Sequence, residues 1–233
     1  MAAGYGTSPF FVFAGYDAAG EYFQFVELLF GGLPARHKAD GLDGHSWWPM
    51  FRTTPAEYVE SYYPVRISSY VPARDTGGAG LHRGGTGIEK TYVFTGPGAF
   101  TVNDDRATIP PWGINGGRHG GCSTKKLIRV TGEVVELASK IDQVPVAAGD
   151  TLVFRTAGAG GWGDPLERDP ELVLRDVLRD LVSHEAARRD YGVVIDGDAV
   201  DTAATATEQA RLRDERGPIQ PFDFGHAPTG EST

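Results

Sequence analysis

The chain has 233 residues, of which 22 are Lys or Arg and 31 are Asp or Glu, so its formal net charge is -9. Because nucleic acid and anionic membrane surfaces are bound through clustered basic residues, this balance argues against both as main partners. Hydrophobic residues make up 40% of the chain and 32 residues are Gly, which predicts a folded, glycine-rich protein of one large or two small domains. Because only one residue is Cys, a disulfide framework and a cysteine zinc site are not expected.

Short runs of β-forming residues, separated by glycine and proline, fill the first 163 residues. This spacing favours an all-β sandwich or barrel over alternating strand–helix units. We therefore expect an α+β, mainly β protein, with a glycine-rich, irregular β-sandwich or barrel-like domain over residues 1–163. One helix, over residues 55–62, is expected to begin at Thr54 as N-cap and to end before Pro64. The expected strands are 10–13, 22–28, 65–70, 89–94, 100–102, 127–130, 134–137 and 152–155.

After Gly163 the pattern becomes helical, so residues 164–217 are expected to form a C-terminal helical segment. Asp169 and Pro170 are typical of a helix start, and the apolar residues that follow have helical spacing, at positions 174, 177, 178 and 181. Ser183 is expected to cap a second helix that ends at Gly192, and residues 193–195 to form a short strand. A third helix is expected from about residue 199 to 216, followed by a flexible tail over residues 218–233.

Residues 158–163 read G-A-G-G-W-G and fit the pattern of a dinucleotide-binding loop. Such a loop needs a helix that begins at its last glycine, because the helix amides bind the pyrophosphate. Here Asp164 and Pro165 come next, and a helix is expected only from Pro170, so we expect a tight turn. No P-loop or nucleophile elbow is present, and Cys122 is expected to be a small loop residue. The chain itself is therefore predicted to bind no nucleotide cofactor.

Two features are candidates for a binding site. His37, Asp40, Asp43 and His45 offer imidazole and carboxylate ligands over a short loop, which would suit a divalent metal ion, but Asp residues in such a pattern are more often turn residues that bond their own backbone. Arg83 lies among glycines, so its guanidinium group would either clamp an anion or hold neighbouring carbonyl groups and a carboxylate such as that of Asp75.

The aromatic pair Trp47-Trp48 is interpreted as core or interface anchors rather than a ligand platform. The first ten residues lack the basic and apolar regions of a signal peptide, and the apolar runs are too short to cross a bilayer. These features predict a soluble, cytoplasmic protein.

A series of glycine motifs follows in a fixed order along the chain. The motifs include Gly31-Gly32, Asp40-Gly41, Asp43-Gly44, Asp75-x-Gly77-Gly78, Arg83-Gly84-Gly85, Pro111-Trp112-Gly113, Gly158 to Pro165 and Tyr191-Gly192-Val193. Taken together, these motifs resemble the C-terminal portion of the hydantoinase B/5-oxoprolinase family, over roughly residues 22–197. Members include the B components of N-methylhydantoinases and caprolactamase, and the matching subunits of acetone and acetophenone carboxylases.

The resemblance implies a subunit, split or truncated, of an ATP-dependent enzyme that hydrolyses cyclic amides or carboxylates ketones. A hydantoinase A-like ATPase subunit would bind ATP and Mg²⁺, another chain would supply the missing N-terminal half of the B component, and a divalent metal would be possible in the complex. Arg83, followed by Asp43, His45 and Glu60, is then expected to face the site. The alternative is a non-catalytic scaffold subunit. A missing half would also leave an exposed apolar surface, expected from residues 10–13 and 22–30.

Overall fold

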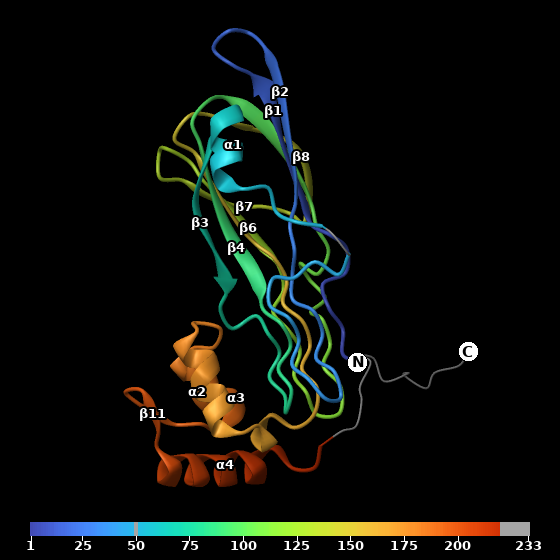
Figure 1. Cartoon of the computed structure of the whole chain (residues 1–233), viewed down its shortest axis with the longest axis vertical. Coiled ribbons are helices and arrows are strands. Elements are labelled where there is room, and N and C mark those ends of the chain that lie inside the picture. Colours follow the sequence, from blue (N-terminus) through green and yellow to red (C-terminus); the bar gives the residue numbers. More distant parts are fainter. Residues whose placement is uncertain (49–50, 220–233) are drawn as a thin grey trace, which may run out of the picture.

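The computed structural model describes residues 1–48 and 51–219, and two antiparallel sheets dominate it (Figure 1). The first sheet has the strand order β2-β1-β5-β8 and the second β3-β4-β9-β6-β7. Both sheets have free edges, so the fold is a sandwich of open sheets rather than a closed barrel. The strands are β1 (Phe10–Tyr16), β2 (Tyr22–Leu28), β3 (Val65–Ala73), β4 (Gly87–Phe94), β5 (Gly98–Asn103), β6 (Thr124–Ile128), β7 (Val134–Glu136), β8 (Lys140–Val146) and β9 (Thr151–Arg155).

Aromatic side chains fill the space between the two sheets. Alternation along β1 points Phe11 and Phe13 inward, and both are fully buried. The ring of Phe11 stacks on Tyr92 of β4 at 4.5 Å between centroids, and the ring of Phe13 lies 4.8 Å from that of Phe94. The exposed apolar surface expected from residues 10–13 and 22–30 is therefore largely wrong, because most apolar side chains of these segments face the core, although Tyr22 and Val26 are more than half exposed.

The predicted elements match the structure with some corrections. Helix α1 (Ala56–Tyr62) has Pro55 at its N-cap position, and no side chain caps it, so Thr54 is not its N-cap. Strand β8 is absent from the sequence prediction, because Asp142, Gln143 and Pro145 interrupt its apolar pattern. It lies at the edge of its sheet, where a proline is tolerated because one side of the strand has no partner.

The glycine-rich segments form a layer of extended chains beyond the sandwich. Gly85 N–H donates to the carbonyl of Leu33 and Ala159 N–H to that of Gly85, both at 2.9 Å. A Cβ atom on Gly32 would lie 2.0 Å from the Gly85 carbonyl oxygen, and one on Gly160 1.9 Å from that of Trp112, so only glycine permits these approaches. Residues 158–162 run through this layer hydrogen-bonded to neighbouring segments, and the chain bends only at Gly163, which has a positive φ angle, so the tight turn expected over residues 158–163 is wrong for most of this range. The layer consists of parts of residues 2–5, 31–45, 76–87, 111–121 and 156–163.

The C-terminal segment packs beside the glycine layer (Figure 1). Asp169 and Ser183 cap α2 and α3 as predicted, and Gly192 ends α3 with a positive φ angle. Ala79 of the layer belongs to the same buried cluster as Val173 of α2, so the helices and the layer share a core. The elements are the 3-10 helix η1 (Pro165–Glu167), α2 (Pro170–Leu178), α3 (His184–Tyr191), β10 (Ile195–Asp196), β11 (Ala199–Val200) and α4 (Thr202–Arg216).

Two sequence expectations in this region change. Leu178, expected in the apolar stripe of α2, is 60% exposed, and the helix ends there. The short strand begins at Ile195 and pairs with β11 in a hairpin. No helix among residues 1–48 and 51–219 is both long and apolar enough to cross a membrane.

Candidate functional site

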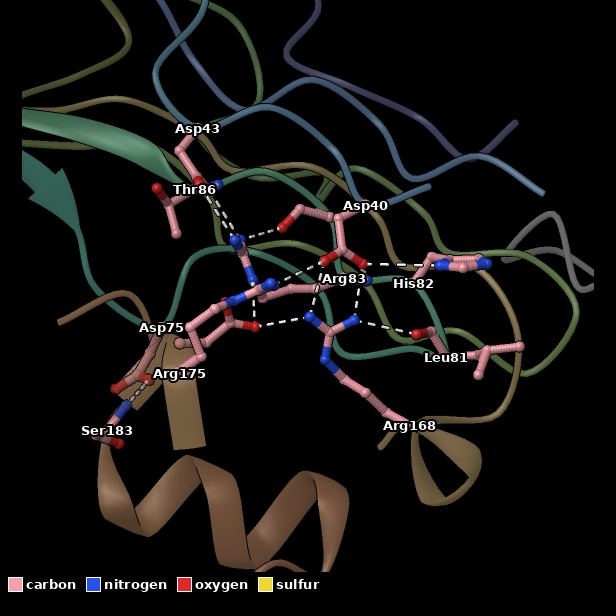
Figure 2. A network of polar contacts seen from close by, with 12 residues as sticks. Asp40, Asp43, Asp75, Leu81, His82, Arg83, Thr86, Arg168, Arg175 and Ser183 are labelled. Carbon is pink, nitrogen blue, oxygen red and sulfur yellow. Dashed lines mark hydrogen bonds and ion pairs between the residues drawn. The ribbon is translucent and has the colours of Figure 1, made fainter. Parts of the chain in front are cut away.

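The most connected group of charged side chains lies where the glycine layer meets the helical segment (Figure 2). We call it the Arg83–Arg168 network; its members are Arg83, Arg168, Asp40, Asp43 and Asp176. Asp40 and Asp43 come from the loop between β2 and α1, Arg83 from the loop between β3 and β4, and Arg168 and Asp176 from the start of the helical segment. The network therefore joins three segments that are distant in sequence.

Arg83 is held by two carboxyl groups. Its terminal nitrogens donate to the two carboxylate oxygens of Asp43 at 2.8 and 3.1 Å, and its Nε donates to Asp176 Oδ2 at 3.3 Å. The same guanidinium group donates to the carbonyl of Gly84 at 2.7 Å. The backbone N–H of Thr86 donates to Asp43 Oδ1 at 2.7 Å, which fixes the carboxylate in place. The side chain of Arg83 is 3% exposed, so no face of it is open to a ligand.

Arg168 makes a parallel arrangement. Its two terminal nitrogens donate to the two oxygens of Asp40 at 2.7 Å each, and Nη2 also donates to Asp176 Oδ2 at 2.8 Å. Nη1 donates to the carbonyl of Leu81 at 3.0 Å. Asp176 thus accepts from both buried arginines, while Asp40 also accepts the backbone N–H of Arg83 at 2.8 Å. The partly exposed Arg175 completes the group, 3.8 Å from Asp40.

The charges of the network stabilise one another. Burial alone would raise the pKa of the Asp40 carboxyl, but the hydrogen bonds and charge of Arg168 outweigh it, so this pKa lies below its ordinary value. Burial opposes the charge of Arg83, yet Asp43 and Asp176 raise its pKa above the ordinary value. The arginines therefore remain charged and paired. With their terminal nitrogens committed to internal carboxylates, the network fastens the helical segment to the glycine layer.

The structure separates the residues that the sequence suggested as one site. Arg83 and Asp43 are brought together. Of the two roles expected for Arg83, it holds neighbouring carbonyl and carboxylate groups, but its carboxylate partners are Asp43 and Asp176 and not Asp75. Asp75 instead accepts the backbone N–H of Ser183 at 2.7 Å. Glu60 lies on α1, at the far end of the sandwich from α2, and accepts the backbone N–H of Ile67 at 2.8 Å (Figure 1).

The suggested metal ligands do not converge. The exposed His37 lies with its ring 5.0 Å from that of Trp162, and His45 is exposed, with its backbone paired to Gly31. Asp40 and Asp43 each face an arginine. Within residues 1–48 and 51–219, no group of three or more His, Cys, Asp or Glu side chains is placed to hold a metal ion.

Sequence reasoning missed Arg168 and Asp176. A signal for Asp176 was present in the sequence, because helical spacing places it with Val173 and Val177 on the side of α2 that packs inward. A carboxylate at such a buried position needs a charged or hydrogen-bonding partner, so its position predicts one. Sequence reasoning also missed two buried ion pairs between the sheets. Lys90 donates to Glu27 at 2.5 Å and Lys125 donates to Asp104 at 2.7 Å, with all four side chains at most 2% exposed.

A second feature is open to solvent and is aromatic. Tyr5, Trp47, Trp48 and Phe51 form a continuous series of ring contacts, with successive centroids 6.3, 4.9 and 5.4 Å apart. Trp47 is 47% and Trp48 37% exposed, so of the two roles expected for this pair, core or interface anchors, the core role is wrong. We call this series, with the hollows beside it, the Trp47 surface.

Trp47 lines two hollows. One, of about 460 Å³, is walled mainly by apolar side chains, including Tyr5, Leu33, Pro34 and Leu42, with Arg36 among its lining residues. The other, of about 410 Å³, lies toward β1 and β2 and includes Phe10 and Leu28. The Tyr5 hydroxyl donates to the carbonyl of His45 at 3.1 Å, which ties the first hollow to the loop that carries the tryptophans.

Comparison with known proteins places these features in a family context. The model of the hydantoinase B/oxoprolinase family matches residues 1–165, which include the sandwich, the glycine layer and the Trp47 surface. The putative B component of a D-/L-hydantoinase from Pseudomonas sp. (strain NS671) is 31% identical over 88% of this chain and 35% of its own length. The beta component of the caprolactamase from Pseudomonas jessenii is 30% identical over 90% of this chain and 38% of its own length.

Two solved structures have the same fold. The ATP-dependent caprolactamase from Pseudomonas jessenii superposes with a TM-score of 0.77, at 28% identity, over 90% of this chain and 38% of that chain. A nucleotide-free acetone carboxylase superposes with a TM-score of 0.78, at 21% identity, over 92% of this chain and 34% of that chain. The chain thus spans about a third of the length of these relatives.

Proposed function

This chain belongs to the hydantoinase B/oxoprolinase family, and from that premise we propose that it acts as one part, split or truncated, of the B component of an ATP-dependent enzyme. The reaction that we propose is the hydrolysis of a cyclic amide. The observation that carries this proposal is the family match over residues 1–165, together with two relatives of about 30% identity across nine tenths of the chain.

The names of these relatives favour cyclic amides over ketones. Hydantoins, caprolactam and 5-oxoproline are all cyclic amides, and the two relatives that match about nine tenths of this chain at 30% identity or more carry the first two names. The acetone carboxylase likeness, at 21% identity, supports the fold alone. Carboxylation of a ketone is therefore the second candidate reaction, and the assay described below includes it.

The structure supports a role that depends on other chains. Arg83 and Asp43, the residues most strongly expected at a site, bind each other, and the described residues hold no metal-ligand group. We propose that ATP and Mg²⁺ are bound by a hydantoinase A-like ATPase subunit and that another chain supplies the rest of the B component. A divalent metal, if the complex uses one, would then depend on that chain, and we propose a cytoplasmic location for the whole.

A non-catalytic scaffold subunit is the alternative function. The internal pairing of the arginines favours it, because a buried guanidinium group whose charge is matched by internal carboxylates offers no exposed donor to a substrate. Under this alternative, the complex would turn over substrate equally well without this chain, once the other subunits were assembled.

Reconstitution distinguishes these functions. The chain would be combined with an ATPase subunit and the remainder of a B component, and ATP hydrolysis would be measured with hydantoins, lactams and ketones plus bicarbonate. We expect substrate-stimulated ATP turnover and ring opening of a cyclic amide only when this chain is present. The same turnover without the chain would support the scaffold alternative, and no turnover from the complete mixture would refute the enzyme proposal.

A further inference from the structure

The Trp47 surface gathers several exposed aromatic side chains in one place. Trp47, Trp48 and Phe51 are each more than a third exposed and touch one another in sequence. Large exposed apolar patches mark interaction sites, and tryptophan is enriched among the residues that dominate binding energy. Leu42, which lines the larger hollow, is also 45% exposed.

The surface stands on a rigid base. A Cβ atom on Gly41 would lie 2.0 Å from the Leu33 carbonyl oxygen, and one on Gly85 1.9 Å from that of Leu42, so both walls of the larger hollow are packed directly on the glycine layer. The Tyr5 hydroxyl accepts the backbone N–H of Trp47 at 3.3 Å and holds the start of the aromatic series. A preformed surface of this kind loses little conformational entropy on binding.

The length of the relatives is the basis on which we choose the occupant. This chain covers 35% of the hydantoinase B component and 38% of the caprolactamase beta component, so most of each relative lies outside the matching unit. The Trp47 surface falls within residues 1–165, the part that the family model matches. Interfaces that are permanently covered resemble a hydrophobic core, and the walls of the larger hollow, which are mainly apolar, have that character.

We propose that the Trp47 surface is the docking face for the polypeptide that forms the rest of the B component, and that apolar side chains of that polypeptide fill the larger hollow beside Trp47. This inference rests on the proposed function, because it takes its partner from the family. It assigns the contact to one face of the glycine layer and not to α1 or the C-terminal helices.

The test uses the part of the Pseudomonas jessenii caprolactamase beta component that lies outside the match to this chain, expressed separately. A preparation of this fragment is used only after it has been shown to bind the remaining part of the caprolactamase beta component, which is the part that matches this chain. Binding of our full chain is then measured by calorimetry, together with iodide quenching of tryptophan fluorescence. We expect a complex in which quenching decreases, and an affinity at least about 30-fold lower for the double variant Trp47→Ala/Trp48→Ala, as for a pair of dominant interface residues.

Tyr58→Ala is the matched control. Tyr58 is 52% exposed, like Trp47, but lies on α1, where its ring packs only against Tyr62 among the aromatic contacts of the described residues. The control is expected to bind as the unmodified chain does, and circular dichroism must show all variants folded. An unchanged affinity of the tryptophan variant, a failure of the unmodified chain to bind, or a self-association through Trp47 that the partner does not displace would each overturn the proposal. A complex that forms through Trp47 but shows no ATP-driven turnover after a hydantoinase A-like ATPase subunit is added would refute the proposed function and leave the docking face intact.

Discussion

Asp176 is the residue on which the Arg83–Arg168 network depends, so its replacement by Asn is the most informative single change. The carboxylate is 2% exposed and accepts from two guanidinium groups that are themselves at most 3% exposed. Asn keeps the shape and has a helix propensity close to that of Asp, so the variant removes the charge and little else. Two buried arginines then lose a shared partner, and the neighbouring carboxylates Asp40 and Asp43 remain to compensate in part.

Removal of one partner of a buried ion pair reduces the free energy of unfolding by about 3–5 kcal/mol. Because both arginines keep their pairs with Asp40 and Asp43, we expect a loss near the lower end of this range, about 3 kcal/mol. For a chain of this size that corresponds to a decrease in Tm of roughly 6–12 °C. Urea unfolding followed by circular dichroism measures the free energy of unfolding, and hydrogen exchange shows whether α2 and α3 are released before the sandwich unfolds. Because the network joins these helices to the glycine layer, we expect their amides to exchange first.

The matched control is Asp180→Asn. Asp180 pairs with Arg74 at 2.7 Å, but both side chains are more than half exposed, so the expected loss is below about 1 kcal/mol. If Asp176→Asn cost no more than Asp180→Asn, the network would not be what holds the helical segment in place. The reasoning about a closed structural cluster would then be refuted, and Arg83 would again be a candidate for ligand binding.

Three further outcomes are expected. The folded-state pKa of Asp40 is lowered, so its contribution to stability is present above its ordinary pKa of 3.8 and is lost as the pH falls through the lower, folded value. The free energy of unfolding, measured between about pH 2 and 6, should therefore decrease less steeply with falling pH in Asp40→Asn than in the unmodified chain. An identical decrease in the two proteins would contradict this reasoning. Glu27→Gln removes the charge that partners Lys90, which is 1% exposed, and should reduce the free energy of unfolding by about 3 kcal/mol in urea; a loss below about 1 kcal/mol would show that the lysine finds another partner. Gly85→Ala should reduce the free energy of unfolding by about 3 kcal/mol, because its Cβ would lie 1.9 Å from a backbone oxygen that cannot move freely. In the control Gly6→Ala the new Cβ would lie 3.3 Å from its nearest atom, so this variant should be tolerated. Equal Tm values for the two variants would refute the close-packed layer.

Local signals in the sequence predicted the helix ends of the C-terminal segment. Asp169 accepts the backbone N–H of Glu171, Ser183 accepts that of Ala186, and Gly192 adopts a positive φ angle. In each case the cap and the group that it satisfies lie within a few residues of each other, so the sequence alone contains both partners. Strand alternation in the same way predicts that Phe11 and Phe13 share a face.

The order of the glycine motifs was the other strong signal. It pointed to the hydantoinase B/oxoprolinase family, which the match over residues 1–165 bears out. The structure explains why these motifs are informative: many of the glycines lie where two backbones approach too closely for a Cβ atom, so their positions describe the packing of the layer.

Composition and local pattern determined the mainly β fold and the helical C-terminal segment, and the resemblance carried by the ordered glycine motifs indicated the family. Only the tertiary structure decided what Arg83 binds and which aromatic residues are exposed. The Arg83–Asp43 and Arg168–Asp40 pairs join residues 40 and 128 positions apart, and Trp47 is exposed although the sequence left a core role and an interface role open for it. The physical reason is that caps and strand alternation are satisfied by near neighbours, whereas charge pairing and burial depend on whichever distant segments the completed fold brings together.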